Sequence, residues 1–259
     1  MRAGKPLMPR FCFRAAGAAL GVCLPLLCAG PAPAQVAPDA LRLAPGQPSP
    51  SLPADGSYLA GDNRFVIARA GNYERLRFSG DDEIYYLTIE PAPMGGRVLK
   101  YDTGEIVMQV AGWGGVTLYT HKVPGGLPAE RTGDAAGLDP EPVPPGDQVK
   151  TFAIGFSDEI QSRAGLLFGF RANWDAFAHS DSLRAMAAGA IRNSARAIER
   201  VAASRQAGQA LLAQFDVVRI TPGNEPSVSI GDKMLTITFA PSQGMGACPS
   251  SLLIAKTIR

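Results

Sequence analysis

Short apolar runs separated by glycine-containing turns occupy residues 57–123 and favour β-strands over helices. The runs recur at a spacing of about ten residues, which is typical of antiparallel sheets. They are RFVIARA (64–70), ERLRFSG (74–80), EIYYLTIE (83–90), RVLKY (97–101), EIVMQVAG (105–112) and GVTLYTHK (115–122). In the last run, Val116 and Leu118 alternate with Thr117 and Tyr119, as expected when one face of a strand is buried. The pattern predicts an antiparallel meander, a sandwich or a small barrel.

The second half of the chain mixes helical and strand patterns, so the fold class predicted for the whole chain is α+β. The clearest helix covers residues 181–215, where apolar residues follow three-and-four spacing. Ser180 or Asp181 can cap its start, and Gly208 can kink or split it. The other expected elements are strands at 148–156, 217–221 and 251–258, a hairpin of 227–230 and 233–239 turning at Gly231-Asp232, and a strand or helix at 164–172. We therefore predict an antiparallel meander or sandwich-like half, a long helix and a C-terminal β-hairpin.

Residues 1–34 have the three parts of a secretory signal peptide. Basic residues precede an apolar stretch at residues 15–30. The small residues Ala32 and Ala34 then predict cleavage before Gln35. The apolar stretch is shorter than the run of about 20 residues that a membrane-spanning helix needs. We therefore expect a periplasmic or secreted protein.

Two alternatives to simple cleavage stay open. The apolar stretch could be retained as a membrane anchor. Alternatively, the protein could be a lipoprotein modified at Cys23 or Cys28, although these cysteines follow Val22 and Leu27 where a small residue is usual.

Signal removal would change both the cysteine content and the charge of the chain. Cys248 would be the only cysteine left, so no disulfide could form within the chain. Four of the 25 basic residues and none of the 23 acidic ones would leave, which changes the net charge from +2 to −2. This charge gives no reason to expect nucleic acid as a partner.

Two stretches rich in proline lack any periodic pattern. Residues 35–56 predict a disordered tether. Residues 124–147 combine proline, glycine and acidic residues, and a long stretch of this kind is usually a functional loop or a linker. We therefore expect a single α+β domain at 57–259 with a long mobile loop at 124–147. No segment after the signal is apolar and long enough to predict a transmembrane helix.

Asp102-Thr103-Gly104 is the tripeptide that carries the catalytic carboxylate of aspartic proteases. Such a site needs two carboxylates, but the chain after the signal contains no second Asp-Thr-Gly or Asp-Ser-Gly. The flanking Tyr101 and Glu105 also differ from the apolar and small residues usual in those proteases. Asp and Gly are both favoured in tight turns. We therefore interpret the tripeptide as a hairpin turn with an exposed, unpaired carboxylate and with Gly104 at positive φ.

Cys248 is the candidate nucleophile, with His121 or His179 as its base. Pro249 follows it directly, which is unlike the helix N-terminus that activates many catalytic thiols. The histidines and the cysteine do not match a zinc-binding spacing, and no phosphate-binding glycine loop or nucleophile elbow occurs. We therefore expect neither cofactor nor metal, and no enzyme of a recognised class. The alternative is a hydrolase that uses Cys248 with His121 or His179.

The candidate binding residues are Trp113, Tyr119, His121, Arg192, Arg196 and Arg200. The three arginines share one face of the expected helix. They could contact an anionic envelope component, such as acidic lipid or a wall polymer, or form a solvated face. The other three residues lie around one expected hairpin and could form an aromatic patch, although packing in a core explains a tryptophan equally well.

Residues 64–120 contain RFVIARAG followed by EIYYLTIEPAPMGGRVLKYDTGEIVMQVAGWGGVTLYT. They resemble an uncharacterised exported family of alphaproteobacteria that is catalogued as a domain of unknown function. The shared pattern is a strand, PAP-GG, a strand, D-GE, a strand and GG-TL-T. The resemblance implies export and a single structural unit, and it brings no catalytic residues. We therefore predict an exported protein of unknown function that acts as a non-catalytic binding or structural module.

Overall fold

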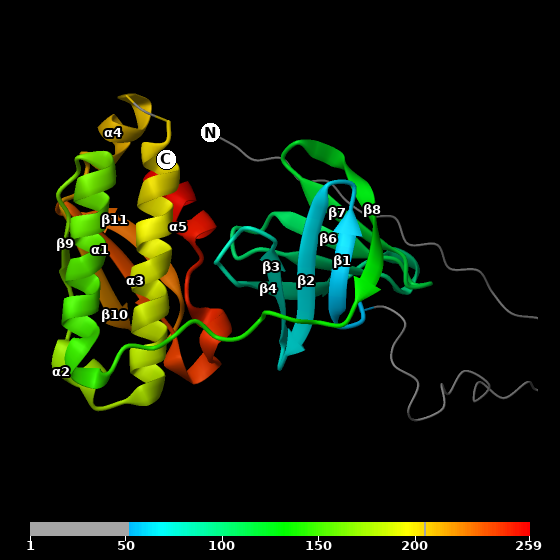
Figure 1. The fold of residues 1–259 in the computed structure, drawn as a ribbon, viewed down its shortest axis with the longest axis horizontal. Helices are drawn as coiled ribbons and strands as arrows, with labels where there is room; N and C mark the ends of the chain where they lie inside the picture. The colour runs from blue at the N-terminus through cyan, green and yellow to red at the C-terminus, as the bar shows by residue number, and fades with distance from the viewer. Residues whose placement is uncertain (1–51, 205) are drawn as a thin grey trace, which may run out of the picture. The chain divides into compact units, whose positions relative to one another are not determined.

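The computed structural model describes residues 52–204 and 206–259. The predicted signal peptide at 1–34 and most of the predicted tether at 35–56 therefore lie outside the described residues. The described chain begins with a closed β-barrel and continues into helices and a second, four-stranded sheet (Figure 1). This mixture of helices with an antiparallel β half agrees with the predicted fold class.

The strands of the barrel each pair antiparallel with the strands next to them in the chain. They are β1 (Gly56–Ala60), β2 (Asn63–Ala70), β3 (Tyr73–Phe78), β4 (Tyr85–Pro91), β5 (Arg97–Lys100), β6 (Ile106–Val110), β7 (Val116–Thr120) and β8 (Val123–Gly133). The last strand, β8, also pairs with β1 and so closes the ring. The predicted antiparallel meander is confirmed, and it closes into a barrel instead of a sandwich.

Strand β8 occupies the first part of the stretch at 124–147 that we expected to be a mobile loop. Its sequence, VPGGLPAERTG, is rich in proline and glycine, which are rare in strands. Register shifts where β8 pairs with β7 and with β1 accommodate the irregular backbone. Because both edges are paired, the loop prediction is wrong for residues 124–133. Residues 134–145, here called the linker segment, carry neither helix nor strand within the described chain.

Apolar side chains fill the interior of the barrel. Alternate residues point inward, as Phe65 and Ile67 of β2 and Leu76 of β3 illustrate, and all three are fully buried. A barrel of about eight strands has an interior just wide enough for such side chains. The barrel interior is therefore a packed core, and a ligand site is expected outside it.

Helices and a mixed sheet form the second half of the described chain. The helices are α1 (Val149–Ala164), α2 (Trp174–Ala178), α3 (Asp181–Ala202), α4 (Gln206–Leu212) and α5 (Ser251–Ile258), with short 3₁₀ turns η2 (Pro93–Gly95), η3 (Gly146–Gln148), η4 (Pro241–Gln243) and η5 (Met245–Ala247). The strands are β9 (Gly169–Arg171), β10 (Val217–Pro222), β11 (Ser227–Gly231) and β12 (Met234–Phe239), in the sheet order β11-β12-β10-β9. Strand β10 is parallel to both β9 and β12, whereas β11 is antiparallel to β12.

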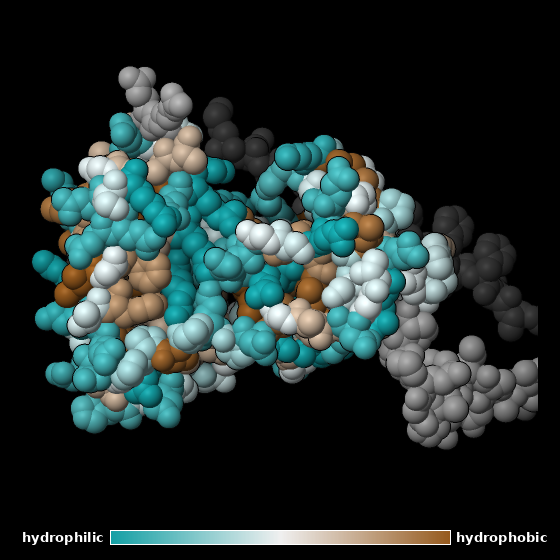
Figure 2. Space-filling view, in the orientation of Figure 1, coloured by the Kyte–Doolittle hydropathy of each residue, from teal (hydrophilic) through white to brown (hydrophobic). Residues whose placement is uncertain are grey.

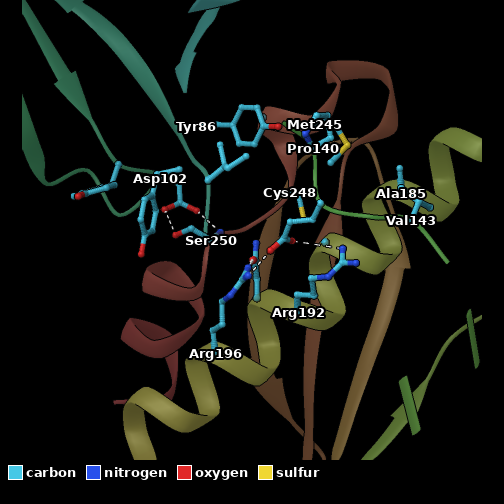
Figure 3. A pocket seen from close by; sticks show the side chains of 17 residues that line it. Tyr86, Asp102, Pro140, Val143, Ala185, Arg192, Arg196, Met245, Cys248 and Ser250 are labelled. Atoms are coloured by element: carbon cyan, nitrogen blue, oxygen red, sulfur yellow. Dashed lines mark hydrogen bonds and ion pairs between the residues drawn. The ribbon is translucent and has the colours of Figure 1, made fainter. Parts of the chain in front are cut away.

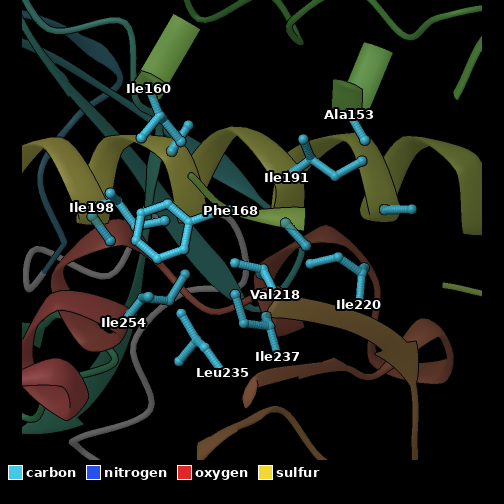
Figure 4. Close-up of a cluster of buried hydrophobic side chains, with 14 of the residues drawn as sticks. Ala153, Ile160, Phe168, Ile191, Ile198, Val218, Ile220, Leu235, Ile237 and Ile254 are labelled. Carbon is cyan, nitrogen blue, oxygen red and sulfur yellow. The ribbon is translucent and has the colours of Figure 1, made fainter. Parts of the chain in front are cut away.

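Helices α1, α3 and α5 contact this sheet or one another through apolar side chains (Figure 4). Ile191 and Ile198 of α3 lie in the same fully buried cluster as Val218 of β10 and Ile237 of β12. Fully burying a side chain of this kind contributes about 1.5–3 kcal/mol. The core therefore fixes the position of α3, which carries the candidate arginines.

Two segments that we predicted as strands are helices. Residues 149–156 belong to α1, whose buried side chains recur at helical spacing, and Gln148 ends the 3₁₀ turn before it. Residues 251–258 form α5, where the Ser250 side chain caps the first turn by accepting a hydrogen bond from Leu253 N–H at 3.2 Å. Both strand predictions are wrong because an apolar run of this length fits a buried strand and a buried helix equally well.

The predicted helix at 181–215 is divided into α3 and α4. Ser180 caps α3 as expected, accepting a hydrogen bond from Leu183 N–H at 3.4 Å. A Cβ at Gly208 of α4 would lie 2.0 Å from the Val201 carbonyl oxygen, so a side chain has no space where α4 meets the end of α3. The helix is therefore split, as the sequence suggested, but the break lies between Ala202 and Gln206, and Gly208 itself belongs to α4.

The remaining predicted elements are mostly confirmed. Strand β10 matches the prediction at 217–221, and the short β9 lies inside the ambiguous stretch at 164–172. The C-terminal hairpin is formed by β11 and β12, but its turn residues are Asp232 and Lys233 instead of Gly231 and Asp232. Both turn residues have positive φ, 52° and 56°, as a type I′ turn requires.

Candidate functional site

The N-terminus of α5 contacts two carboxylates that come from turns of the barrel. Asp102, in the β5–β6 turn, accepts hydrogen bonds from Ser250 N–H at 2.7 Å and from the Ser250 hydroxyl at 2.6 Å. Glu83, just before β4, accepts one from Ser251 N–H at 2.8 Å and another from the Ser251 hydroxyl. Negative charge is favourable at a helix N-terminus. These contacts therefore hold α5 against the barrel.

The Asp102 tripeptide is a hairpin turn, as predicted, but its carboxylate is not free. Tyr101 N–H donates to the Glu105 carbonyl at 2.9 Å, and Gly104 has a φ of 83°. Asp102 is exposed as a residue, as predicted, but the prediction of an unpaired carboxylate is wrong, because both carboxylate oxygens accept hydrogen bonds from Ser250. Burial raises the pKa of Asp102, and the bonds from Ser250 oppose that change. Its recorded partners among the described residues are an amide and a hydroxyl, so the paired carboxylates of an aspartic protease are not formed there.

A cavity of about 320 Å³ lies beside these contacts (Figure 3). Five parts of the chain build its wall: the start of β4 with the residue before it, the β5–β6 turn, the linker segment, α3 and residues 245–250. Apolar groups form much of the lining, as Val143, Ala185 and Met245 illustrate. Pockets for small molecules generally have this size and apolar character.

Arg192 and Arg196 form a polar side of the cavity, and both contact Glu141 of the linker segment. They are one turn apart on α3, so they share a face. The Arg192 guanidinium lies 3.5 Å from one Glu141 oxygen, and Arg196 donates to the other. Arg192 also donates to the Pro142 carbonyl and lies 4.8 Å from the centre of the Phe152 ring. Burial lowers the pKa of Arg192, and Glu141 opposes that change.

Arg200, the third arginine of the predicted stripe, contacts the barrel. Its Nη2 donates to Tyr85 Oη at 2.8 Å and lies 3.4 Å from Asp81 and 3.5 Å from Glu83. Burial raises the pKa of Glu83, whose side chain is 1% exposed, and Arg200 opposes that change. Each arginine of the stripe therefore contacts an acidic side chain. Binding of an external anion by the stripe stays a prediction.

The structure does not bring Trp113, Tyr119 and His121 together. Trp113 is 78% exposed in the β6–β7 turn, whereas His121 follows the other end of β7. The strand between them spans roughly 17 Å at about 3.3 Å per residue. Tyr119 donates to Gln109 at 2.9 Å, and Tyr119 and His121 line a hollow together with Arg200. A binding role for these residues stays a prediction.

Cys248 lines the cavity, and neither histidine contacts its thiol. The thiol donates weakly to the Met186 carbonyl at 3.7 Å, and burial raises its pKa to about 12. His121 is 91% exposed and lies 4.0 Å from Glu105. The His179 ring contacts the Asp175 carbonyl at 2.6 Å. Within residues 52–204 and 206–259, no hydrogen bond joins Cys248 to an imidazole, so the arrangement needed by the hydrolase alternative is not assembled.

Sequence reasoning misses Tyr86, Glu141 and Gly189, which the cavity brings together from three separate elements. The local signal for Glu141 is weak: it is an acidic residue between Pro140 and Pro142 in a stretch without periodicity. Among the described residues, no group of three or more His, Cys, Asp or Glu could hold a metal ion. No helix in the same part of the chain is long and apolar enough to cross a membrane.

Residues 39–258 match the family described as Domain of unknown function (DUF4908). The chain belongs to this family. The DUF4908 match spans both the barrel and the helical half, and it confirms the part of the resemblance that concerned a domain of unknown function. Export and a bacterial origin stay predictions. No match to the chain was found among curated proteins or among solved structures.

Proposed function

We propose that this chain is an exported, non-catalytic binding module whose ligand occupies the cavity beside Arg192 and Arg196. The observation that carries the proposal is the cavity itself, which combines about 320 Å³ of space with an apolar lining and polar groups on one side. An apolar wall favours a ligand by removing its surface from water, and a few polar groups fix its orientation.

The state of the groups around the cavity supports binding over catalysis. With its pKa raised to about 12, the Cys248 thiol stays protonated at neutral pH and is a poor nucleophile. Asp102 accepts two hydrogen bonds from Ser250, which leaves it poorly placed to accept a proton from a substrate. The Cys248 hydrolase is therefore the less favoured candidate.

A small ligand fits these contacts better than a large anionic polymer along α3. Arg192 and Arg196 already contact Glu141, and Arg200 contacts Asp81 and Glu83. The face shown in Figure 2 is mainly hydrophilic, with hydrophobic residues in small, separate patches. Large protein-binding surfaces usually show a broader apolar patch.

Export rests on the sequence of residues 1–34 and has its own test. The basic residues, the apolar stretch and the Ala32-Pro33-Ala34 pattern support cleavage before Gln35. We expect N-terminal sequencing of protein from a periplasmic fraction to begin at Gln35. An intact Met1 in a membrane pellet would contradict the export proposal.

The cavity can be tested by filling it. A Cβ at Gly189 would meet only the Cys248 sulfur, at 3.7 Å, so a leucine at this position has its remaining space in the cavity. Leucine is also favoured over glycine in a helix by roughly 0.8 kcal/mol. We expect the wild type to bind a neutral apolar fluorophore, such as N-phenyl-1-naphthylamine, in a saturable way, and Gly189→Leu to lose this binding.

Gly155→Leu is the matched control, because Gly155 lies on the exposed side of α1 with nothing near its Cβ position. We expect this variant to bind the fluorophore like the wild type, while thermal unfolding shows that both variants are folded. Equal binding by the folded Gly189→Leu variant and the wild type would contradict a ligand site in the cavity.

A further inference from the structure

We propose that the ligand is a small amphipathic anion, with an apolar chain and a carboxylate head group, and that the Glu141 carboxylate holds the position that this head group would take. The inference rests on the proposed function, because it concerns the ligand of the same cavity. It is carried by the contacts of Arg192, Arg196 and Glu141 and by their place on the cavity wall.

Two guanidinium groups converge on a single carboxylate. Arg192 contacts one oxygen of Glu141 and Arg196 the other, and the two arginine side chains are only 12% and 20% exposed. Hydrogen bonds between arginine and carboxylate are among the strongest in proteins, and their planar geometry selects carboxylate and phosphate groups. The pair carries one more positive charge than Glu141 neutralises. The geometry is therefore that of an anion site whose occupant comes from the chain itself.

The rest of the cavity suits an apolar chain. Figure 3 shows Arg192 and Arg196 projecting from α3, with Val143, Ala185 and Met245 also on the wall. The volume of about 320 Å³ lies at the small end of the range found for ligand pockets, so a small ligand fits. An alkyl carboxylate such as octanoate has this size.

The position of Glu141 makes its carboxylate the replaceable member of the group. The arginines belong to α3, which the buried core fixes through residues such as Ile191 and Ile198. Glu141 belongs to the linker segment, which carries neither helix nor strand. Donors on a rigid helix are preorganised and lose little freedom when a ligand binds. A ligand carboxylate can therefore take over both contacts while the linker segment moves aside.

Asp102 is the other acidic group on the cavity wall, and it sets the direction of the ligand. Its oxygens accept hydrogen bonds from Ser250, so they offer an anion no donor. An anionic head group would be repelled there and attracted at Arg192 and Arg196. We therefore place the head group at the arginines and the apolar chain along the rest of the wall.

The test compares octanoate with 1-octanol, which has the same chain length and no charge, by calorimetric titration of the full folded chain. In Glu141→Gln, the arginines lose their internal carboxylate. We expect this variant to bind octanoate about tenfold tighter than the wild type, in line with the strength of hydrogen bonds to charged groups. We expect 1-octanol affinity to stay within about twofold, since the apolar wall is unchanged.

Two further variants complete the design. Glu199→Gln removes a negative charge from α3, the helix that carries Arg192 and Arg196. Glu199 contacts Arg163 and does not line the cavity, so we expect the affinities for octanoate and for 1-octanol to stay unchanged. Arg196→Gln removes a head-group donor and should weaken octanoate binding while 1-octanol still binds.

The outcomes separate this inference from the proposed function. If 1-octanol binds but Glu141→Gln leaves octanoate affinity unchanged, or changes both affinities equally, Glu141 does not hold a head-group position and the inference is wrong, while the cavity remains a binding site. If neither compound binds to the wild type or to Glu141→Gln, both the inference and the proposed function are wrong. Circular dichroism spectra like that of the wild type verify that each variant is folded.

Discussion

Asp102 and Ser250 are joined by two hydrogen bonds, at 2.7 and 2.6 Å, although 148 positions separate them in the chain. Glu83 and Ser251 are joined in the same way across 168 positions. Ser250 caps α5 and Ser251 is its first residue, so a carboxylate from each of two barrel turns meets one helix N-terminus. Asp102 and Ser250 also line the cavity. The contact that holds α5 against the barrel therefore also shapes the candidate site.

Replacing Asp102 with asparagine tests this contact. Asparagine keeps the local turn. Its side chain has one acceptor oxygen and one donor nitrogen, so it can accept a hydrogen bond from only one of the two Ser250 donors, the N–H and the hydroxyl. The substitution also removes the negative charge at the N-terminus of α5. We expect Asp102→Asn to lower the free energy of unfolding by about 1–2 kcal/mol. Asp62→Asn, in the exposed β1–β2 turn, is the matched control and should cost less than about 0.5 kcal/mol. Equal losses in urea denaturation would mean that the Ser250 contact contributes no stability.

Replacing Gly104 with valine tests the turn itself. Gly104 has a φ of 83°, a region that β-branched residues resist. We expect Gly104→Val to destabilise the protein by about 1–3 kcal/mol. Gly125→Val in β8 is the control, because Gly125 has open space at its Cβ position and no positive φ. A control variant as unstable as Gly104→Val would show that the loss comes from valine at exposed glycines in general, and not from the turn conformation.

The sequence predicts the barrel strands better than the helices because the strand signals are local. Glycine turns and alternation at 57–123 identify β2 to β7 without knowledge of distant contacts. The apolar runs at 148–156 and 251–258 are too short to separate a helix from a strand by periodicity. Strand β8 has a sequence typical of a loop and depends on pairing at both edges.

The candidate site was largely beyond sequence reasoning, for a related reason. Arg192 and Arg196 are recognisable as neighbours on one helix face, since their spacing is local. Their partner Glu141 lies 55 positions before Arg196, in a stretch without a periodic pattern. Such contacts depend on how the barrel, the linker segment and α3 fold together. Local spacing therefore identified the cations of the site and left their anion and the cavity unknown.

The buried Glu74 predicts a pH dependence of stability. Glu74 of β3 is 1% exposed, its nearest cation is Arg69 at 3.7 Å, and among the described residues one of its oxygens has no hydrogen-bond partner. Burial raises the pKa of Glu74 from its ordinary value of 4.5 to about 7, against the attraction of Arg69, and the nearby Asp55 raises it further. The folded protein thus holds this proton more tightly than the unfolded chain does. Protonated Glu74 therefore contributes to the free energy of unfolding. This contribution is fully present below pH 4.5 and is lost as the pH rises through about 7.

Glu74→Gln should remove this dependence. We expect the variant to equal the wild type in free energy of unfolding near pH 4 and to exceed it by about 1–3 kcal/mol at pH 8. Because Asp102 and Glu83 also have raised pKa values, the quantity to follow is the difference between variant and wild type across the pH range. Glu90→Gln, at an exposed residue on β4, is the control and should change stability by less than about 0.5 kcal/mol. A constant difference from pH 4 to pH 8 would contradict a raised pKa at Glu74.

Replacing Arg200 with methionine tests the contact between α3 and the barrel. The substitution keeps most of the apolar stem but leaves the buried carboxylate of Glu83 without its cation, and Tyr85 without a donor to its hydroxyl. Removing one partner of a fully buried ion pair costs about 3–5 kcal/mol. The Arg200 side chain is 37% exposed, so water screens part of this interaction, and we expect a loss of about 2 kcal/mol at pH 8.

The stability lost in Arg200→Met should become smaller as the pH falls, because a protonated, neutral Glu83 no longer needs a cation. The raised pKa of Glu83 means that its protonation begins at a higher pH than that of an ordinary glutamate. Arg163→Met is the matched control: Arg163 contacts Glu159 at 2.6 Å and Glu199 at 3.0 Å, but its side chain is 62% exposed. Exposed pairs of this kind contribute about 0–1 kcal/mol, so we expect a small loss in the control at either pH. Urea denaturation of the wild type and both variants at pH 5 and pH 8 measures the change in free energy of unfolding for each variant at each pH. If Arg200→Met cost no more than the control at pH 8, the arginine would not stabilise the Glu83 carboxylate, which would then depend on its two hydrogen bonds from Ser251.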